Sequence, residues 1–194
     1  LPTPTMSPPT RLDPPDFDEL KCLRTLGVGS FGRVTLMEHV PSQTVFAMKR
    51  MSRAFIKKYR HEETARRERE IMGGVDNPFV SRLVASYSGE KCLYILMDWC
   101  RGGELLVQLE RQETGRFHPE TVAFYVAGIS VGLMYLHDRG VVFRGVMPEN
   151  VMIAEDGYPV LIDFGFSKKI GVNGRTHTLV GAPDYIAPEI LMRS

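Results

Sequence analysis

The sequence has little cysteine, little histidine and no excess of either charge, and each shortage argues against a class of function. The three cysteines (Cys22, Cys92 and Cys100) have neither disulfide-framework nor zinc spacing, which favours a reducing compartment such as the cytoplasm. The five histidines are scattered and pair with no cysteine cluster, so we expect no zinc-type metal site. A net charge of +1 provides no overall field for nucleic acid or an anionic membrane, and we expect neither partner.

Long hydrophobic runs are also missing. The longest apolar stretch, residues 125–136, is interrupted by Gly128 and Gly132. It is shorter than a membrane span, which needs about 18 to 20 residues. No signal peptide is visible. With 43% hydrophobic and 24% charged residues, the 194-residue chain is expected to fold as one globular domain or two small lobes.

The most informative absence lies in residues 142–150. Arg144 and Asn150 keep the spacing of a phosphoryl-transfer loop, (H/Y)-R-D-x-x-x-x-N, in which Asp accepts the substrate's proton and Asn holds magnesium. The Asp position is Gly145. The loop therefore has the frame for phosphoryl transfer without the side chain that accepts the proton.

The first fifteen residues contain six prolines, separated mainly by threonine and serine. This composition cannot bury a core and predicts a disordered linker over residues 1–15. A docking ligand for a proline-binding module is the alternative. Because the sequence begins with Leu1 and ends five residues after Glu189, we expect it to be a fragment of a longer protein.

Three glycines, Gly27, Gly29 and Gly32, form the pattern G-x-G-x-x-G-x-V. Alone, this pattern fits either a dinucleotide-binding turn or a phosphate-covering hairpin. A dinucleotide fold needs a helix that begins at the third glycine, whereas residues 34–37 are β-prone and a second strand is expected over residues 44–49. Between two strands, glycines let backbone N–H groups approach phosphates without Cβ obstruction. A dinucleotide module remains only a remote alternative.

Lys49 ends the second strand, where it can contact the phosphates of a nucleotide under the glycine hairpin. A helix is predicted over residues 60–72 and ends at two glycines. It carries Glu68 and Glu70, which face different sides and are both candidates to pair with Lys49.

In the second half of the chain, the sequence predicts a strand, a connector and a long helix. The strand covers residues 93–97 and the connector residues 98–103. Pro119 is expected as the first residue of the helix. Its apolar stripe repeats at helical spacing, and we assign it to the core. The stripe consists of Val122, Tyr125 or Val126, Ile129, Leu133 and Leu136.

A hairpin is predicted after the 142–150 loop, from residues 151–153 and 160–162 around a turn at 155–157. It presents the triplet Asp-Phe-Gly at Asp163, thirteen residues after Asn150. In that setting the Asp chelates magnesium.

From about Asp16 to its end, the chain resembles the cyclic-nucleotide-dependent, AGC-type branch of the serine/threonine protein kinases. The ordered motifs are the glycine loop, Ala-Met-Lys, Gly-Gly-Glu, Pro-Glu-Asn, Asp-Phe-Gly-Phe and Asp-Tyr-Ile-Ala-Pro-Glu. The resemblance implies an α+β, two-lobed fold, with a small β-rich N-lobe at 16–97, a hinge at 98–103 and part of a mainly helical C-lobe at 104–194. The sequence of residues 168–171 is more similar to that of the cGMP-dependent members, although the cAMP-dependent kinases are also similar.

The resemblance also implies a site for ATP and Mg²⁺. The implied catalytic positions are Lys49, Glu68, Arg144, Asn150 and Asp163, of which Asn150 and Asp163 would hold the metal. The implied nucleotide contacts are Leu26, Gly27, Gly29, Ser30, Phe31, Gly32, Val34, Ala47, Lys49, Met97, Cys100, Glu104, Met152 and Asp163, with Met97 as gatekeeper.

Regulation and substrate choice follow from the same resemblance. Thr178 matches an activation-loop phosphosite, whose phosphate would pair with Arg144. Glu104 and Glu149 would favour a protein substrate with basic residues before its Ser or Thr. A regulatory cyclic-nucleotide-binding region would lie outside these residues.

Three departures from the family fall together. Relatives have the catalytic Asp at the position of Gly145 and a Lys at the position of Met147. At the position of Ala182 they have a threonine that hydrogen-bonds this Asp and Lys. General-base catalysis contributes about 10²–10⁴-fold and a charge-stabilising donor about 10²–10³-fold. We therefore expect phosphoryl transfer to fall about a thousandfold or more, while nucleotide binding persists. The first hypothesis is a Mg-ATP-binding, catalytically impaired kinase that acts as a scaffold or regulator. The second is an active kinase in which another group accepts the proton.

Overall fold

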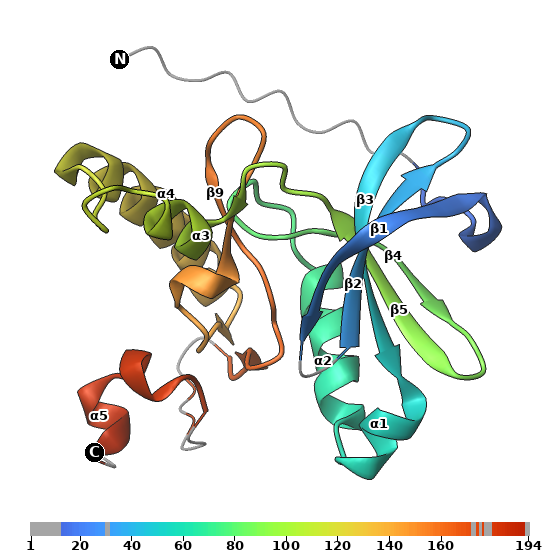
Figure 1. The fold of residues 1–194 in the computed structure, drawn as a ribbon. Helices are drawn as coiled ribbons and strands as arrows, with labels where there is room; N and C mark the ends of the chain where they lie inside the picture. Colours follow the sequence, from blue (N-terminus) through green and yellow to red (C-terminus); the bar gives the residue numbers. More distant parts are fainter. Residues whose placement is uncertain (1–12, 30–31, 172–173, 175, 177–179, 193–194) are drawn as a thin grey trace.

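The computed structural model describes residues 13–29, 32–171, 174, 176 and 180–192. They form two lobes, which confirms the α+β, two-lobed fold (Figure 1). The N-lobe is an antiparallel sheet of five strands in the order β1-β2-β3-β5-β4, with two helices beside it. Its elements are η1 (Phe17–Glu19), β1 (Leu20–Gly29), β2 (Gly32–His39), β3 (Thr44–Ser52), α1 (Arg53–Lys58), α2 (Glu62–Gly73), β4 (Leu83–Ser88) and β5 (Cys92–Asp98).

The glycine motif lies at the tip of the β1–β2 hairpin. Gly29 and Gly32 are the last paired residues of the two strands. Gly32 has φ +148°, and a Cβ there would overlap the carbonyl oxygen of Arg50 on β3, so only glycine fits. Because a strand and not a helix begins at Gly32, the dinucleotide-binding alternative is wrong.

The N-lobe extends slightly before residue 16. Pro15, assigned to the linker from composition, is buried, and its carbonyl accepts a 2.6 Å hydrogen bond from the Tyr87 hydroxyl. Phe17 packs on Tyr87 and Tyr94, with ring centroids 5.1 Å and 4.9 Å apart. The end of the proline-rich segment is therefore held against the sheet by aromatic packing.

The C-lobe follows a connector, residues 99–102, that contains no helix or strand. It has a three-stranded sheet (β6-β8-β9), a two-stranded pair (β10-β7) and the long helix α4. Its elements are β6 (Gly103–Glu104), α3 (Leu105–Glu110), α4 (Pro119–Asp138), β7 (Val141–Val142), η2 (Pro148–Asn150), β8 (Val151–Ile153), β9 (Pro159–Leu161), β10 (Lys168–Lys169), η3 (Pro183–Tyr185) and α5 (Pro188–Leu191).

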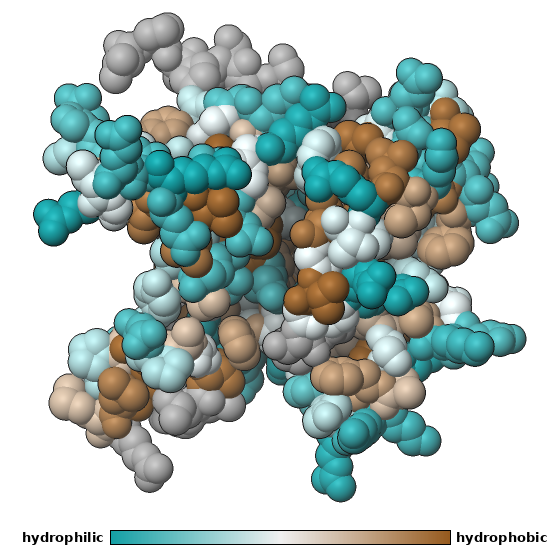
Figure 2. Space-filling model, in the orientation of Figure 1, coloured by the Kyte–Doolittle hydropathy of each residue, from teal (hydrophilic) through white to brown (hydrophobic). Residues whose placement is uncertain are grey.

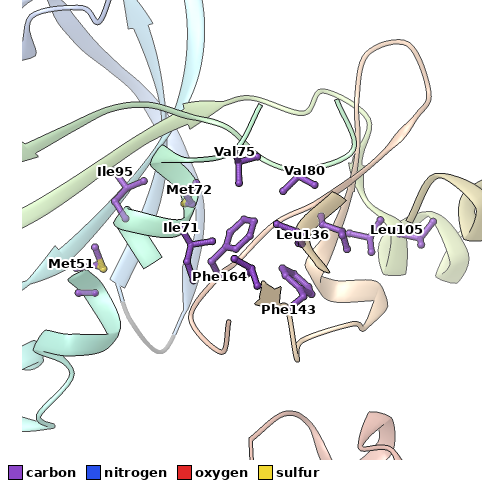
Figure 3. Packing of buried hydrophobic residues seen from close by; sticks show 14 of the residues in the cluster. Met51, Ile71, Met72, Val75, Val80, Ile95, Leu105, Leu136, Phe143 and Phe164 are labelled. Atoms are coloured by element: carbon purple, nitrogen blue, oxygen red, sulfur yellow. The ribbon is translucent and has the colours of Figure 1, made fainter. Parts of the chain in front are cut away.

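One apolar cluster runs through both lobes. Phe164 is fully buried at its centre, between Met72 of α2 and Leu136 of α4, and packs edge-on against Phe143 (Figure 3). The cluster comprises Met51, Ile56, Ala65, Ile71, Met72, Val75, Val80, Ile95, Leu105, Leu136, Val141, Phe143, Val151, Ile153, Leu161 and Phe164. A separate cluster fills one face of the N-lobe sheet. Phe164, the residue after Asp163, is therefore the centre of the packing between the two lobes.

Helix α4 contacts β9 and β7, and its glycines Gly128 and Gly132 face β9 and Phe79. Leu136 is buried and Tyr125, Ile129 and Leu133 are partly buried, as expected for a core stripe. Val122 is 43% exposed, so its assignment to the core is wrong. It lies on the same face but nearer the helix N-terminus, beyond the described residues that cover the stripe.

The 20-residue helix α4 contains the apolar stretch that was expected to be too short for a membrane span. Within the part of the chain that the structure describes, α4 is the one helix long and apolar enough, by length and composition alone, to cross a membrane, so length does not exclude a span. Figure 2 shows hydrophobic residues scattered among hydrophilic ones on the viewed face.

A glycine-to-alanine substitution should have different effects on stability at Gly128 of α4 and at Gly73 of α2. A Cβ at Gly128 would lie 2.6 Å from Pro159 Cγ and 3.0 Å from Phe79 Cε1, whereas at Gly73 of α2 it would meet only Leu83 Cδ2 at 3.6 Å. Gly128→Ala should lower the free energy of unfolding by about 1–3 kcal/mol through overpacking. Gly73→Ala should be neutral or stabilising by up to about 1 kcal/mol. Urea denaturation measures both, and equal effects would contradict the close approach of α4 to β9.

Candidate active site

The site is built around Lys49 of β3. Its Nζ lies 2.6 Å from Glu68 Oε1 of α2 and 3.5 Å from Asp163 Oδ1 of the C-lobe. The Lys49 and Glu68 side chains are only 11% and 5% exposed. Glu70 is exposed and instead pairs with Arg66 one helical turn earlier, at 2.9 Å. Of the two candidate glutamates, the structure thus brings Glu68 to Lys49.

Burial and charge compete at this lysine. Burial by itself would lower the pKa of Lys49, but the carboxylates of Glu68 and Asp163 outweigh it and raise that pKa. Burial raises the pKa of Glu68 against the opposing attraction of Lys49. Lys49 is therefore a fixed cation at the inner end of the cleft, able to attract an anionic ligand.

A cavity of about 190 Å³ lies beside this cluster, between the lobes. Ten of the expected nucleotide contacts line it: Leu26, Gly27, Val34, Ala47, Lys49, Met97, Cys100, Glu104, Met152 and Asp163. Gly29 and Gly32 lie outside its walls, at the hairpin tip. Ser30 and Phe31 lie outside the described residues.

Five further residues line the cavity: Glu68, Met72, Asp98, Trp99 and Ile162. Glu68 was expected only as the partner of Lys49. Asp98, Trp99 and Ile162 adjoin predicted contacts in the sequence, so adjacency to the connector and to Asp163 could have indicated them. Most of the lining is apolar, which suits a flat aromatic ligand.

Cys100 is an unreactive part of this wall. Burial, reinforced by Asp98 and Asp156, raises the pKa of its thiol to about 12. The thiol therefore stays neutral at physiological pH and contributes apolar surface.

A larger cavity, about 510 Å³, lies elsewhere, between α1, α2 and the β4–β5 strands. It contains none of the predicted catalytic residues. The smaller cavity is the candidate site because charged groups with perturbed pKa values converge there.

Two residues of the site have unusual backbones. Arg144 and Asp163 are non-glycine residues with φ +61° and +63°. Arg144 Nε donates to the Phe166 carbonyl at 2.7 Å, and Asp163 Oδ1 accepts from the Gly165 amide at 3.0 Å. Such backbone strain gathers at functional sites because the surrounding structure holds it.

The backbone of Gly145 allows a side chain, but a Cβ there would lie so close to Asn150 that the Asn150 side chain would have to move slightly. The φ of Gly145 is not positive, and a Cβ there would lie 3.1 Å from Asn150 Nδ2 and 3.6 Å from Phe166 Cδ2. Asn150 Nδ2 donates to the Gly145 carbonyl at 2.9 Å. The loop is therefore held by the backbone at position 145.

Ala182 lies in a segment that runs beside this loop. At its neighbour Gly181, a Cβ would lie 3.3 Å from the Arg144 carbonyl oxygen. The three departures from the family pattern therefore occupy one region of the structure.

Arg144 has its own partners. Its Nη1 donates to the Thr176 hydroxyl at 3.3 Å, and burial together with Arg67 lowers its pKa. Thr178, the expected phosphosite, lies outside the described residues.

The donor set fits a magnesium ion shared with a nucleotide. Within the described ranges, no group of three or more His, Cys, Asp and Glu could hold a metal by itself. Mg²⁺ usually takes one or two protein oxygens and completes its shell with phosphates and water. Asp163, whose carboxylate faces the cavity and is 41% exposed, suits that arrangement.

Comparisons with known proteins agree with this geometry. The family model for the protein kinase domain matches residues 20–194. The chain is 39% identical over 178 residues to a cGMP-dependent protein kinase of Eimeria tenella, covering 91% of this chain and 17% of that protein. It is 38% identical over 176 residues to cGMP-dependent protein kinase 2 of Rattus norvegicus, covering 91% of this chain and 23% of that protein.

The chain thus spans about a fifth of the length of these curated relatives. The model match covers most of the sequence, and the fold and the order of the motifs agree with it. The chain belongs to the protein kinase domain family.

Proposed function

We propose that this chain is the nucleotide-binding part of a serine/threonine protein kinase of the cyclic-nucleotide-dependent branch, with impaired phosphoryl transfer. One observation carries the proposal: Lys49, Glu68 and Asp163 are assembled beside the cavity, while the base position at Gly145 has no side chain. The expected role is that of a scaffold or regulator, with a cytoplasmic location.

The two ends of the cavity suit the two ends of ATP. Val34, Ala47 and Met152 provide apolar walls for adenine, and Met97 closes the inner side as gatekeeper. Lys49 provides the charge for the phosphates, held in place by Glu68. The domain limits we propose are an N-lobe that begins at Pro15, one residue earlier than expected, and ends at 97, a hinge at 98–103 and a partial C-lobe at 104–194, after a linker at 1–14.

Asp163 and Asn150 would hold Mg²⁺, which when bound neutralises charge on the transferred phosphate. Asn150 commits its Nδ2 to the Gly145 carbonyl, which leaves its side-chain oxygen as a possible ligand. Asp163 is oriented by the Gly165 amide.

Transfer is impaired because no group at position 145 can accept the proton of an attacking hydroxyl. Met147 cannot supply the positive charge of a lysine, and Ala182 lacks the hydroxyl that would hold both groups. With binding and positioning intact, we expect a slow rate and not a total loss.

The protein substrate and regulation are proposals on the same basis. Glu104, which is exposed at the cavity rim, and Glu149, which is partly exposed, would bind basic residues of a substrate. A phosphate on Thr178 would pair with Arg144, and a cyclic-nucleotide-binding region would lie outside this chain.

Nucleotide binding predicts a specific thermal shift. Millimolar Mg-ATP should raise the midpoint of thermal unfolding, because a ligand that binds only the folded state stabilises it. Lys49→Ala should abolish most of the rise. The matched control is Lys91→Ala, which removes an exposed lysine outside the cavity and should keep it. A natural chain that is folded and shows no shift would refute the proposal.

Restoring the missing groups should restore chemistry. We expect Gly145→Asp, Met147→Lys and Ala182→Thr together to raise phosphate transfer from ATP to a basic Ser peptide by about a thousandfold or more over the natural protein. The control adds Asp163→Ala to both proteins and defines the background. Natural protein that transfers phosphate at a rate comparable to the restored one would show that another group acts as the base.

A further inference from the structure

A fork-shaped ion pair joins the residue before β4 to the last residue of β5, where the connector begins. Arg82, just before β4, donates from Nε to Asp98 Oδ2 at 3.0 Å and from Nη2 to Oδ1 at 3.1 Å. Both oxygens of the carboxylate and two nitrogens of the guanidinium are used. This bidentate geometry fixes the angle as well as the distance between the partners.

The position of Asp98 gives the pair its importance. Asp98 is the last residue of β5 and the last to pair with β3, opposite Phe46. It also lines the nucleotide cavity, as do the next two residues, Trp99 and Cys100. The point where the chain leaves the sheet is therefore the point where the adenine end of the cavity begins.

The strand register places Arg82 for this contact. Leu83 is opposite Met97, so Arg82 and Asp98 are the next pair along, beyond the end of the regular ladder. A β-bulge between Leu83 and Ala85 changes the direction of β4 at this end. The Arg82 side chain is only 22% exposed, which restricts its freedom, whereas the Asp98 side chain is 45% exposed, so solvent screens part of the attraction.

We propose that Arg82 is a positioning residue for the nucleobase. Acting through Asp98, it holds residues 98–100 in the orientation that recognises adenine, so that its loss weakens binding of the base without weakening the grip on the phosphates. The inference rests on the proposed nucleotide binding.

The test compares adenosine, which has no phosphates, with Mg-ATP by calorimetry on the 194-residue chain, at a temperature where every variant is folded. Arg82→Gln and Asp98→Asn should each weaken both ligands by the same factor, roughly three- to tenfold. Arg82→Lys, which keeps the charge without the fork, should lie between. Lys49→Ala is the opposite control: it should weaken ATP and spare adenosine.

A double-mutant cycle tests whether Arg82 acts through Asp98. The double variant Arg82→Gln, Asp98→Asn should bind no more weakly than the weaker single variant. Arg101→Gln breaks a neighbouring ion pair, Arg101 to Glu155 at 3.1 Å, in which both side chains are more than half exposed. It should change neither affinity.

The outcomes separate this inference from the proposed function. Unchanged adenosine affinity in Arg82→Gln, or additive losses in the double variant, would overturn the positioning role while ATP binding stands. A lower unfolding midpoint with unchanged affinities would show that the pair serves stability alone. If the natural chain binds neither adenosine nor ATP, both proposals fail. Should Arg82→Gln not fold, Asp98→Asn and Arg82→Lys decide the matter.

Discussion

A buried lysine between two carboxylates is the interaction on which the site depends. Removing a charge from water costs several kcal/mol unless a partner compensates it. Lys49 and Glu68 therefore require each other, and their contact at 2.6 Å fixes α2 against the sheet. Asp163 brings the C-lobe to the same point, at 3.5 Å, and its neighbour Phe164 fills the core between the lobes. The electrostatic constraint and the apolar core thus define the same arrangement of α2, β3 and the Asp-Phe-Gly segment.

Local patterns predicted most of the fold, because they depend on neighbouring residues. The glycine hairpin, the strand that carries Lys49, the helix from Pro119 and the hairpin before Asp163 follow from turn residues, β-prone runs and helical spacing. The helix α1 (Arg53–Lys58) was not predicted, because six residues are too few to show a helical period. Val122 shows the opposite limit: its spacing matches the core stripe, but burial depends on which segments cover it.

The sequence predicted which residues belong to the site better than it predicted the contacts between them. Spacing alone left Glu68 and Glu70 open, and the family resemblance decided between them. The pairing of Arg82 with Asp98 depends on strand register and on a bulge in β4, which no sequence pattern displayed. The sequence indicates that position 145 lacks a side chain. Only the structure shows that the loop is held through its backbone carbonyl.

That last contact explains how binding and chemistry can separate in one fold. The hydrogen bond from Asn150 uses the backbone of residue 145, and Arg144 is held by the Phe166 carbonyl, so neither contact needs a side chain at the base position. The strained backbones at Arg144 and Asp163 cost about 1–3 kcal/mol each, and the buried Phe164 and these hydrogen bonds sustain them. Under the proposed function, the glycine at position 145 would remove the proton acceptor and leave the loop, Asn150 and Asp163 in place. The family resemblance implies that a hydroxyl at position 182 would pair with side chains at 145 and 147, so the alanine there agrees with their absence under the same proposal.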